Sequence, residues 1–526
     1  MPMVKGIELK SSKIVPLKCK MHDKLIENSV INESKPVERG LPTSRLLTTC
    51  AVVALVGGFH FGFQLSVTIP RADALSDFVF YSPRSHYTMT TLRAGVIGAL
   101  FVGAILGASF VPKLLTSRGC RTSLIVTSIL MITSIIISLI VWLVGVLEWF
   151  IVSRLLTGIS IGMGMTVQSV LISELSPDEH RGSMGMLTGL FINAGIVVSS
   201  ILGVSRVFGG SHLWSLSYFI EALPCLVVLV FAYSRLEESP LYHLKHCHDE
   251  KARESLLLYY GTQQNTDLII KNMKAELGSS DENEDFMRLL KEKPARLALL
   301  LAGLINLTVG LSGVTSISVF GPSFMGDVDL GTNGVELTYV LSTLSGTAGA
   351  LLGSVIIDKI GRRPLLIGGA FSLASLNVAI ALLTFAYKQS RLTQLTYVFV
   401  VLYNIFQFTF ATTLGSIAWF IGAELSGPLS RSRVTSAAIS MQYFAWFLSI
   451  LIYSPLEQLV GPFSSLLFVV PLLSTCLTIF FLLPETKNKS MEEIQHVLSV
   501  PFCGHPIHLH VYLHLRQSFT SSSCRL

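Results

Sequence analysis

Long runs of apolar residues recur along this 526-residue chain, and short polar segments separate them. A helix needs about 20 mainly apolar residues to cross the hydrocarbon core of a bilayer. Runs of that length with few charges therefore predict membrane-spanning helices. They occupy residues 46–69, 92–112, 124–147, 149–172, 186–207, 213–233, 297–320, 337–357, 365–387, 396–421, 435–457 and 462–483. The pattern predicts an all-α integral membrane protein with twelve transmembrane helices.

The polar segments divide the chain into five expected parts. The first precedes the apolar runs, is rich in Lys, and lacks the apolar region of a cleavable signal peptide. The longest internal polar segment follows the sixth run, and its residues 249–259 and 266–277 have a helical composition. We expect a tail (1–45), a six-helix half (46–233), a helical linker (234–296), a second six-helix half (297–483) and a C-terminal tail (484–526).

Composition and charge agree with a membrane protein. The chain is 51% hydrophobic and only 14% charged. Most of its 39 Lys and Arg residues fall in the tails, the linker and alternate connections, as is typical of cytoplasmic segments. Both termini and the linker are therefore expected in the cytoplasm, and the lipid bilayer is the expected partner. The net charge of +6 follows from this topology and gives no reason to expect a nucleic-acid partner.

Two kinds of motif occur once in each half of the chain. The loop Asp358–Pro364 reads D-K-I-G-R-R-P. The segment Arg118–Arg121 reads R-G-C-R and matches the Gly-Arg-Arg portion of that loop except at Cys120. The stretches Glu174–Arg181 and Glu424–Arg431 both begin E-L-S and carry Arg seven residues after Glu. The matching order predicts an internal duplication into two pseudo-symmetric halves. The alternative is that these are simply basic loops on the cytoplasmic side.

Several polar side chains fall inside predicted spans. His60 and Gln64 are four residues apart in the first span and share a helix face, where they serve either interhelical hydrogen bonding or substrate contact. An arginine within a span, Arg154, requires an acid or a water-filled cavity, and Glu148 is a weak candidate for its partner. Glu221 in the sixth span is either a functional carboxylate or a residue near the outer interface.

The seventh span carries a stripe of hydroxyls. Thr308, Ser312 and Thr315 are spaced as neighbours on one helix face, with Asn306 above them and glycines between them. Such a combination is tolerated at membrane depth where it lines a cavity. Hydrogen bonding between helices is the alternative reading of the same stripe.

Trp419 lies five residues before Glu424, near the end of the tenth span. A tryptophan at this depth either anchors the helix at the headgroup level or offers a flat surface on which a ligand can stack.

The linker 234–296 carries no pattern that resembles a phosphate-binding loop, a metal cluster or a nucleophile–base set. We expect no enzymatic activity and no cofactor. Cysteine and histidines gather in the C-terminal tail, but their spacing suits no tetrahedral metal site, so no metal is expected. The tail residues in question are Cys503, His505, His508, His510 and His514.

These landmarks resemble the sugar-porter branch of the major facilitator superfamily, and within it the facilitative glucose transporters of animals. The resemblance extends from about residue 46 to 490. The stretches that carry it are Gly57–Pro70, Arg154–Gly158, Glu174–Gly182, Glu238–Pro240, Leu311–Gly313, Asp358–Arg363, Trp419–Arg431 and Pro484–Lys487. The resemblance implies the major facilitator fold, with two six-helix halves.

The sequence also departs from this family at positions that matter. The family's sugar-binding glutamines and asparagines in spans five, seven and eight are replaced, as are two prolines ahead of the tryptophan and one basic-loop arginine. The residues at these positions are Gly189, Val309, Gly310, Thr315, Gly346, Ser416, Ala418 and Cys120. Of the usual ligands Trp419 is retained.

The resemblance implies facilitated diffusion of a hexose or a related sugar across a membrane. Besides Trp419, the candidate substrate-binding residues are Asn306, Thr308, Ser312, Thr315, Gln64, Asn193 and Gln442. Because a sugar site depends on hydrogen bonds, the lost amides leave open a less polar or anionic solute such as urate, or a polyol. A non-transporting sensor with the same fold is the alternative from a different functional class.

The family implies alternating access, in which two halves rock around a central site. We assign the inner seal to Glu174, Arg181, Asp358, Arg362, Arg363, Glu424 and Arg431. Proton-coupled relatives carry an aspartate where this chain has Gln64, which cannot titrate. We therefore expect a uniporter, in the plasma membrane.

Overall fold

The computed structural model describes residues 43–67, 89–144, 147–177, 179–204, 206–208, 216–261, 266–277, 292–315, 317–318, 331–390, 392–489 and 491–499. All of them belong to one compact unit, Pro42–Leu526. The expectations for residues 1–42 and for the histidines of the C-terminal tail fall outside the described residues. Every regular element within the described ranges is helical, as the sequence predicted.

The helices of the first half follow the predicted apolar runs. They are α1 (Ser44–Ala54), η2 (Leu55–Phe59), α2 (His60–Ser66), α4 (Met89–Val144), α5 (Leu147–Leu175), α6 (Arg181–Leu202) and α7 (Ser217–Ser234). The predicted span 92–112 and residues 124–144 of the next one fall within α4, which is interrupted at Gly119, where φ is +81°. That left-handed conformation is one that glycine adopts at little cost.

The first span contains one turn of π-helix, η2. A π-turn shifts the register of the helix and leaves backbone N–H groups in need of partners. Gln168 on α5 supplies one, because its Oε1 accepts hydrogen bonds from the N–H groups of Gly57 (3.1 Å) and Gly58 (2.9 Å). A side chain at Gly57 would collide with the α5 backbone, since its Cβ would lie 2.7 Å from the nitrogen of Met165.

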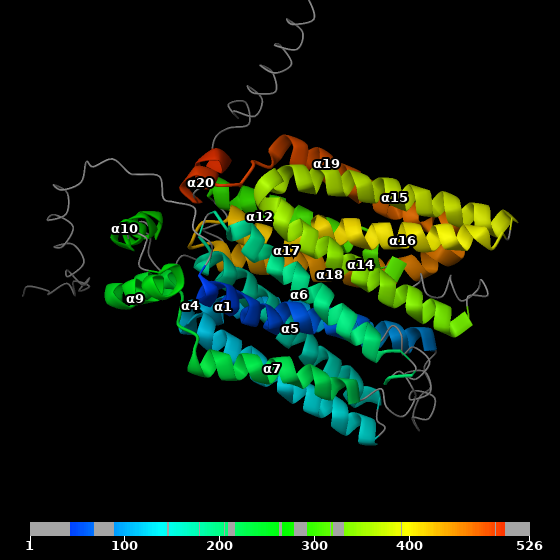
Figure 1. Ribbon diagram of the computed structural model, residues 1–526, viewed down its shortest axis with the longest axis horizontal. Coiled ribbons are helices and arrows are strands. Elements are labelled where there is room, and N and C mark those ends of the chain that lie inside the picture. The colour runs from blue at the N-terminus through cyan, green and yellow to red at the C-terminus, as the bar shows by residue number, and fades with distance from the viewer. Residues whose placement is uncertain are drawn as a thin grey trace, which may run out of the picture. The chain divides into compact units, whose positions relative to one another are not determined.

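The linker and the second half complete the chain. The linker helices are α8 (Pro240–Lys245), α9 (Asp249–Tyr260) and α10 (Thr266–Leu277), and the last two confirm the predicted positions. The second half holds α12 (Lys293–Gly310), α14 (Gly331–Ile360), α15 (Arg362–Ser390), α16 (Gln394–Thr412), α17 (Leu414–Leu425), α18 (Arg431–Val460), η4 (Gly461–Phe468) and α19 (Val469–Leu482), followed by α20 (Met491–Ser499). Figure 1 shows the long helices side by side, with α9 and α10 beyond one end of the bundle.

Ten stretches of the described residues are long and apolar enough to cross a membrane. Two of them, Gly95–Val141 and Arg431–Leu482, are 47 and 52 residues long, and each covers most of two predicted spans. Large apolar side chains are exposed along these helices, for example Phe110 (64%) and Val470 (71%). Exposed apolar surface of this extent suits contact with lipid rather than water.

Close helix contacts in the first half depend on small residues. Along α4 and α5, the backbones approach so closely that a Cβ on Gly103 would lie 2.2 Å from the carbonyl oxygen of Leu155. A Cβ on Gly158 would lie 2.1 Å from the carbonyl oxygen of Leu100. Small residues allow such packing in a membrane, where van der Waals contact, rather than the hydrophobic effect, drives the association of helices.

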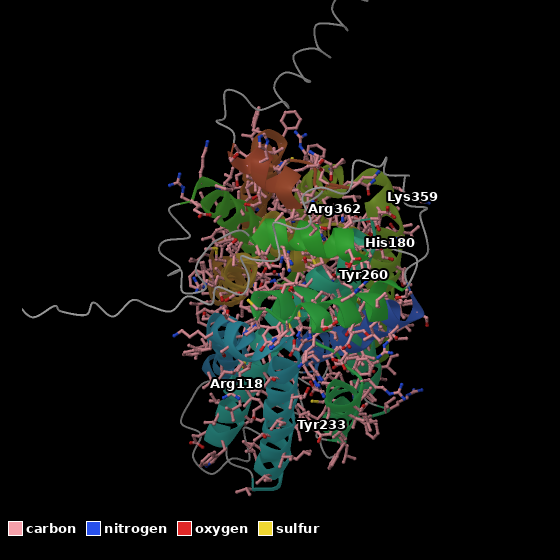
Figure 2. All side chains as sticks on the ribbon, turned by 90° about the vertical axis from the view of Figure 1, so that its left-hand side faces the viewer. Arg118, His180, Tyr233, Tyr260, Lys359 and Arg362 are labelled. Carbon is pink, nitrogen blue, oxygen red and sulfur yellow. The ribbon has the colours of Figure 1, made fainter. Side chains whose placement is uncertain are left out.

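The basic loops of both halves lie at the same end of the bundle. Figure 2 looks onto that end and shows Arg118 of the first half together with Lys359 and Arg362 of the second. His180, which precedes α6, and Tyr260, at the end of α9, lie at this end as well. We refer to it below as the basic end.

Candidate functional site

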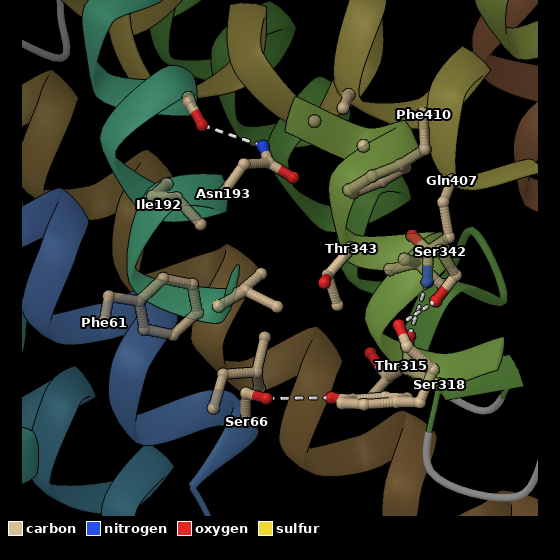
Figure 3. Close-up of a pocket in the computed structure, with 18 of the residues that line it drawn as sticks. Phe61, Ser66, Ile192, Asn193, Thr315, Ser318, Ser342, Thr343, Gln407 and Phe410 are labelled. Atoms are coloured by element: carbon tan, nitrogen blue, oxygen red, sulfur yellow. Dashed lines mark hydrogen bonds between the residues drawn. The ribbon is translucent and has the colours of Figure 1, made fainter. Parts of the chain in front are cut away.

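A pocket of about 80 Å³ lies between the two halves. Its lining comes from α2 and α6 of the first half and from α14, α16, α17 and α18 of the second, together with residues 314–318. Figure 3 shows Phe61 and Asn193 facing Thr343 and Phe410 across it. Asn193, Thr315 and Trp419 are the sequence-predicted binding residues that line this pocket.

Hydroxyls and amides at the pocket wall are joined in pairs. Ser66 Oγ and Tyr339 OH lie 2.9 Å apart and link the first half to the second. Gln407 Nε2 donates to Ser318 Oγ at 2.9 Å, and Asn193 Nδ2 donates to a carbonyl of its own helix at 2.8 Å. Each pair keeps spare acceptor capacity, because an amide or hydroxyl oxygen has two lone pairs. A polar solute can therefore be bound without every existing bond being broken.

The residues on the α14 side of the pocket were not predicted from the sequence. Tyr339, Ser342, Thr343 and Gly346 all line it. Their spacing of three, four and seven residues places them on one helix face. This stripe was visible in the sequence. Its hydroxyls lie in an otherwise apolar span, and that is the signal by which they could have been found.

Aromatic rings from both halves pack beside the pocket. Phe61 on α2 stacks on Trp446 of α18, with ring centroids 5.0 Å apart and an interplanar angle of 15°. Trp419 on α17 meets Phe61 edge-on at 5.4 Å and approaches Trp446 at 5.7 Å. Trp419 is only 2% exposed. This burial does not fit a headgroup anchor, and the stacking of a ligand on Trp419 stays a prediction.

The predicted hydroxyl stripe on a single helix face is wrong. α12 ends at Gly310, and φ is +89° at Gly313, so Thr308 and Thr315 do not belong to one continuous helix. Glycine makes this break possible, because it adopts a positive φ freely. Thr308 Oγ1 hydrogen-bonds to Thr475 of α19, the interhelical alternative, whereas Thr315 lines the pocket.

Three further candidate residues lie in the interior, outside the pocket lining. Asn306 Nδ2 donates to the carbonyls of Ala302 (2.8 Å) and Ala418 (3.1 Å), and so joins α12 to α17. Ser312 Oγ donates to the carbonyl of Val309 at 2.8 Å. Gln442 is fully buried on α18. A substrate-binding role for these residues stays a prediction.

Gln64 belongs to a buried polar cluster in the first half. Its Nε2 donates to Oε2 of Glu221 at 2.6 Å, and its Oε1 accepts a hydrogen bond from Arg154. His60 Nδ1 lies 3.3 Å from the other carboxylate oxygen of Glu221. Glu221 is fully buried among the helices, and both readings of it from the sequence stay predictions. Glu148 is exposed, and no ion pair joins it to Arg154 within the described residues. The carboxylate and the guanidinium, bridged by one amide, offset each other's charge inside the bundle.

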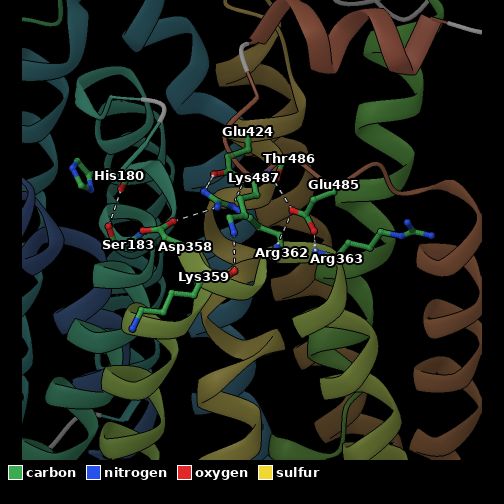
Figure 4. Close-up of polar contacts among 10 residues, drawn as sticks. All are labelled: His180, Ser183, Asp358, Lys359, Arg362, Arg363, Glu424, Glu485, Thr486 and Lys487. Carbon is green, nitrogen blue, oxygen red and sulfur yellow. Dashed lines mark hydrogen bonds and ion pairs between the residues drawn. The ribbon is translucent and has the colours of Figure 1, made fainter. Parts of the chain in front are cut away.

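An ion-pair cluster occupies the basic end of the second half (Figure 4). Arg362 donates to Glu424 through Nη2 (2.8 Å) and Nε (3.2 Å), and through Nη1 to Asp358 at 3.3 Å. Thr486 Oγ1 also donates to Glu424, at 3.1 Å. Arg362 and Glu424 are each 2% exposed. Bidentate guanidinium–carboxylate pairs of this kind are strong and geometrically specific.

The first half touches this cluster through the start of α6. The N–H of Ser183 donates to Oδ2 of Asp358 at 3.1 Å, and an acid is favoured at the positive end of a helix. Gly182 leaves so little room that a Cβ there would lie 2.3 Å from Oδ1 of Asp358. The two halves are therefore in contact at the basic end.

A carboxylate holds the backbone of the basic loop in each half. Glu485 accepts hydrogen bonds from the N–H groups of Arg362 (3.0 Å) and Arg363 (3.1 Å). Arg363 Nη2 donates to the carbonyl of Phe480 at 2.6 Å. The chain turns just before these donors at Gly361, whose φ is +103°.

The first half repeats this arrangement. Glu238 accepts from the N–H groups of Cys120 and Arg121, both at 2.9 Å, next to the positive φ of Gly119. Arg121 donates to backbone carbonyls at the end of α7, as Arg363 does at the end of α19. Burial raises the pKa of Glu238 to about 7, against the opposing effect of the two N–H donors. The matching contacts agree with the predicted duplication.

The remaining predicted gate residues lie beside these loops. Glu174 accepts a hydrogen bond of 2.5 Å from Ser239, in the same way that Glu424 accepts one from Thr486. Arg181 begins α6 and Arg431 begins α18. Asp358, Arg362 and Glu424 thus form one cluster, whereas a gating role for all seven predicted residues stays a prediction.

Comparisons with known proteins agree with this architecture. The family described as "Sugar (and other) transporter" matches residues 50–498. A facilitated glucose transporter member 3 of the solute carrier 2 family from Ovis aries is 25% identical over 456 residues, which cover 84% of this chain and 90% of the relative. Member 9 from Mus musculus is 24% identical over 488 residues, which cover 87% of each chain.

Solved structures share the fold. The proton:xylose symporter XylE bound to 6-bromo-6-deoxy-D-glucose superposes with a TM-score of 0.75 at 20% identity, covering 86% of this chain and 99% of that one. The fucose:proton symporter FucP from E. coli superposes with a TM-score of 0.57 at 11% identity, covering 83% and 99%. Both are proteins of the major facilitator fold. At these identities the likeness establishes the fold alone.

Proposed function

The chain belongs to the sugar (and other) transporter family, and we propose that it carries a hexose or a related sugar across a membrane by facilitated diffusion. The observation that supports this most directly is a pocket lined by both halves, beside a closed contact between the halves at the basic end. A solute bound there is released to one side when the halves rock apart at that end. This is the alternating-access mechanism of two-repeat transporters.

The chemistry of the pocket favours a neutral ring. Among its described lining residues none carries a charge, so the pocket offers no counter-ion to an anion such as urate. Hydroxyls and amides from Asn193, Ser318, Thr343 and Gln407 can exchange hydrogen bonds with sugar hydroxyls. The aromatic faces suit the apolar C–H face of a sugar ring.

Transport without protons is supported by the first span. Gln64, an amide, occupies the position that carries an aspartate in proton-coupled relatives, and the nearby carboxylate of Glu221 hydrogen-bonds to it. Both residues lie outside the pocket lining, and both are almost fully buried. We propose a uniporter on this basis, placed in the plasma membrane with both termini in the cytoplasm.

One observation favours a second candidate substrate class. Half of the side chains that line the pocket are apolar, among them Phe61, Leu65, Ile196 and Trp446. A site discriminates for hydroxyls by hydrogen bonds that a wrong substrate leaves unmade, and apolar walls supply none. A less polar cyclic solute is therefore the alternative to a hexose. The remaining alternative is a sensor that has the same fold and transports no solute.

Uptake into proteoliposomes tests the proposal. The panel is D-glucose, D-fructose, D-xylose, myo-inositol and urate, with L-glucose as the control for leakage. We expect at least one D-sugar to enter faster than L-glucose and to stop at the external concentration. Entry of urate or myo-inositol alone would overturn the hexose assignment. Entry of no solute above leakage, from protein that is folded and reconstituted, would leave the sensor alternative.

A further inference from the structure

Polar side chains gather at one side of the pocket, where α14 packs against α16. The lining there holds Ser342, Tyr403 and Gln407, and Ser318 is hydrogen-bonded to the last of these. We call these four residues the polar corner. Figure 3 shows Ser318, Ser342 and Gln407 together on one side of the pocket and Phe61 on the other. A solute with one apolar edge and one hydroxylated edge therefore has a preferred orientation in this pocket.

Tyr403 is the residue of the polar corner whose hydroxyl lacks a protein partner. The side chain is fully buried, its ring stacks on that of Phe399, and it lies one helical turn before Gln407 on the same face of α16. Its OH is next to the side chains of Ser318, Ser342 and Gln407, yet it has hydrogen-bond geometry with none of the described residues. A buried hydroxyl without a partner is unfavourable. The pocket wall therefore holds a donor that a bound molecule can satisfy.

The neighbours of Tyr403 direct their hydrogens elsewhere. Ser342 Oγ donates to the carbonyl of Tyr339 at 2.7 Å, and Gln407 Nε2 donates to Ser318 Oγ at 2.9 Å. Within the described residues Gln407 Oε1 accepts no hydrogen bond, so this oxygen is available as an acceptor. The polar corner thus presents a donor on Tyr403 and an acceptor on Gln407 one helical turn apart.

We propose that Tyr403 is a specificity-determining residue, whose OH donates a hydrogen bond to one ring hydroxyl of the solute while Gln407 Oε1 accepts a hydrogen bond from that same hydroxyl. A hydroxyl both accepts and donates, so it satisfies both groups, whereas an ether or a hydrogen atom at that position does not. The inference rests on the proposed function, since it takes the solute to be a hydroxylated ring. The site then rejects analogues in which this hydroxyl is missing or methylated, because its buried polar groups stay unpaired.

Two other tyrosines provide matched controls. Tyr339 also lines the pocket, but its OH lies 2.9 Å from Ser66 Oγ and is paired with it. Tyr443 on α18 is fully buried with an OH that has no partner among the described residues, but it is not part of the described lining. In each case Tyr→Phe removes one oxygen and keeps the ring. Among these three tyrosines, Tyr403 alone combines an unpaired hydroxyl with a place in the pocket wall.

The first measurement needs no solute. The Tm of the purified full chain is compared between the wild type, Tyr403→Phe and Tyr339→Phe. Because the OH of Tyr403 has no protein partner, Tyr403→Phe is not expected to lower the Tm, whereas Tyr339→Phe breaks a hydrogen bond and is expected to lower it. A loss of Tm in Tyr403→Phe as large as that in Tyr339→Phe would show that the hydroxyl of Tyr403 stabilises the fold, and would overturn the proposal.

The second measurement is binding, read from the intrinsic fluorescence of Trp419 and Trp446, which both line the pocket. The probes are D-glucose and its monodeoxy and mono-O-methyl derivatives. At one ring position we expect both derivatives to bind the wild type about tenfold more weakly than D-glucose, and Tyr403→Phe to bind all three about equally. Tyr443→Phe is expected to keep the tenfold difference. Full discrimination in Tyr403→Phe, or its loss in Tyr443→Phe, would overturn the role of Tyr403.

The binding measurement separates this proposal from the proposed function. If D-glucose binds and Tyr403→Phe discriminates among the derivatives as the wild type does, the hexose assignment stands and the role of Tyr403 is rejected. Failure of every probe to bind the folded wild type would overturn the hexose assignment, and the selection of a sugar hydroxyl by Tyr403 with it.

Discussion

Arg362 and Glu424, on α15 and α17, are joined by two hydrogen bonds of 2.8 and 3.2 Å at a point where both side chains are buried. The pair lies within one cluster with Asp358, the residue that receives the N–H of Ser183 from the other half. Breaking the pair therefore disturbs a contact within the second half and a contact between the halves at once.

The first prediction concerns this pair. Glu424→Gln leaves the Arg362 guanidinium buried without its carboxylate, and removal of one partner of a buried pair costs about 3–5 kcal/mol. We expect the closed state of the basic end to lose population and uptake to fall at least about tenfold at equal surface expression. Arg363→Ala is the comparison, since Arg363 bonds to the carbonyl of Phe480 and not to Glu424. Its uptake is expected to fall less than that of Glu424→Gln. Uptake at the wild-type rate in Glu424→Gln would show that this cluster does not act as a gate.

The second prediction concerns Trp419. Its indole packs edge-on against Phe61 of the other half and lines the pocket. Trp419→Phe keeps an aromatic face, whereas Trp419→Leu removes it. Uptake is expected to fall about tenfold or more in the Leu variant and several-fold less in the Phe variant, since aromatic pairs contribute about 0.5–1.5 kcal/mol beyond simple burial. Equal losses in the two variants would assign Trp419 to packing alone.

The third prediction concerns stability. A Cβ at Gly158 would lie 2.1 Å from the backbone oxygen of Leu100, so Gly158→Ala forces α4 and α5 apart. Overpacking of this kind costs about 1–3 kcal/mol, and the Tm of the purified protein is expected to drop by several degrees. Gly368→Ala is the matched control, because no atom lies within 4 Å of a Cβ at that position. Helix propensity favours alanine over glycine at both positions. A drop of the same size in both variants would therefore show that the close approach at Gly158 is not responsible.

The fourth prediction is a pH dependence at the first basic loop. The pKa of Glu238 is raised to about 7 by burial, so the folded protein holds this proton more tightly than the unfolded chain, where the carboxyl has its usual pKa near 4.5. Stability from this group is therefore fully present below the unfolded pKa and is lost as the pH rises towards 7. Tm measured from pH 5 to 8 should decline more in the wild type than in Glu238→Gln, which cannot titrate. Parallel curves of Tm against pH for the wild type and Glu238→Gln would show that Glu238 is not the source of the pH dependence.

Much of the fold was predictable because a bilayer imposes strict lengths on apolar runs. The bounds of α9 and α10 followed from helical composition, and the duplication followed from the paired loops around Cys120 and Arg362. The end of α12 could not be predicted. Thr308, Ser312 and Thr315 have helical spacing, and only the structure shows that the helix ends at Gly310, before Ser312 and Thr315.

The lining of the pocket was predicted less completely than the charged cluster at the basic end. Asp358, Arg362 and Glu424 are charged residues in an apolar chain, so they stand out in the sequence. The pocket residues Tyr339, Ser342 and Gln407 have common side chains, and their role depends on which helix faces meet at the centre. Trp446 stacks on the ring of Phe61 from the other half. A contact between residues so far apart in the chain cannot be predicted from a local sequence pattern.

The last prediction is that transport is not driven by protons. Coupling requires a group that changes its charge near the working pH and passes that change to the moving parts. Gln64 cannot titrate, and Arg154 stays charged in proteins. Glu221 remains, with His60 beside it, but its carboxylate is engaged by Gln64 and lies outside the lining of the pocket. The solute should therefore equilibrate across the membrane and never be concentrated.

An imposed pH gradient checks this directly. Proteoliposomes that are acidic outside are expected to fill with the transported sugar only to the external concentration, with or without a protonophore. Glu221→Gln and His60→Gln serve as comparison variants and should behave like the wild type in this respect, even if their rates differ. Accumulation above the external level that collapses with a protonophore and disappears in Glu221→Gln would contradict uniport. In that case the Glu221–His60 pair would be the site of proton binding, because it is the titratable pair beside the amide at position 64.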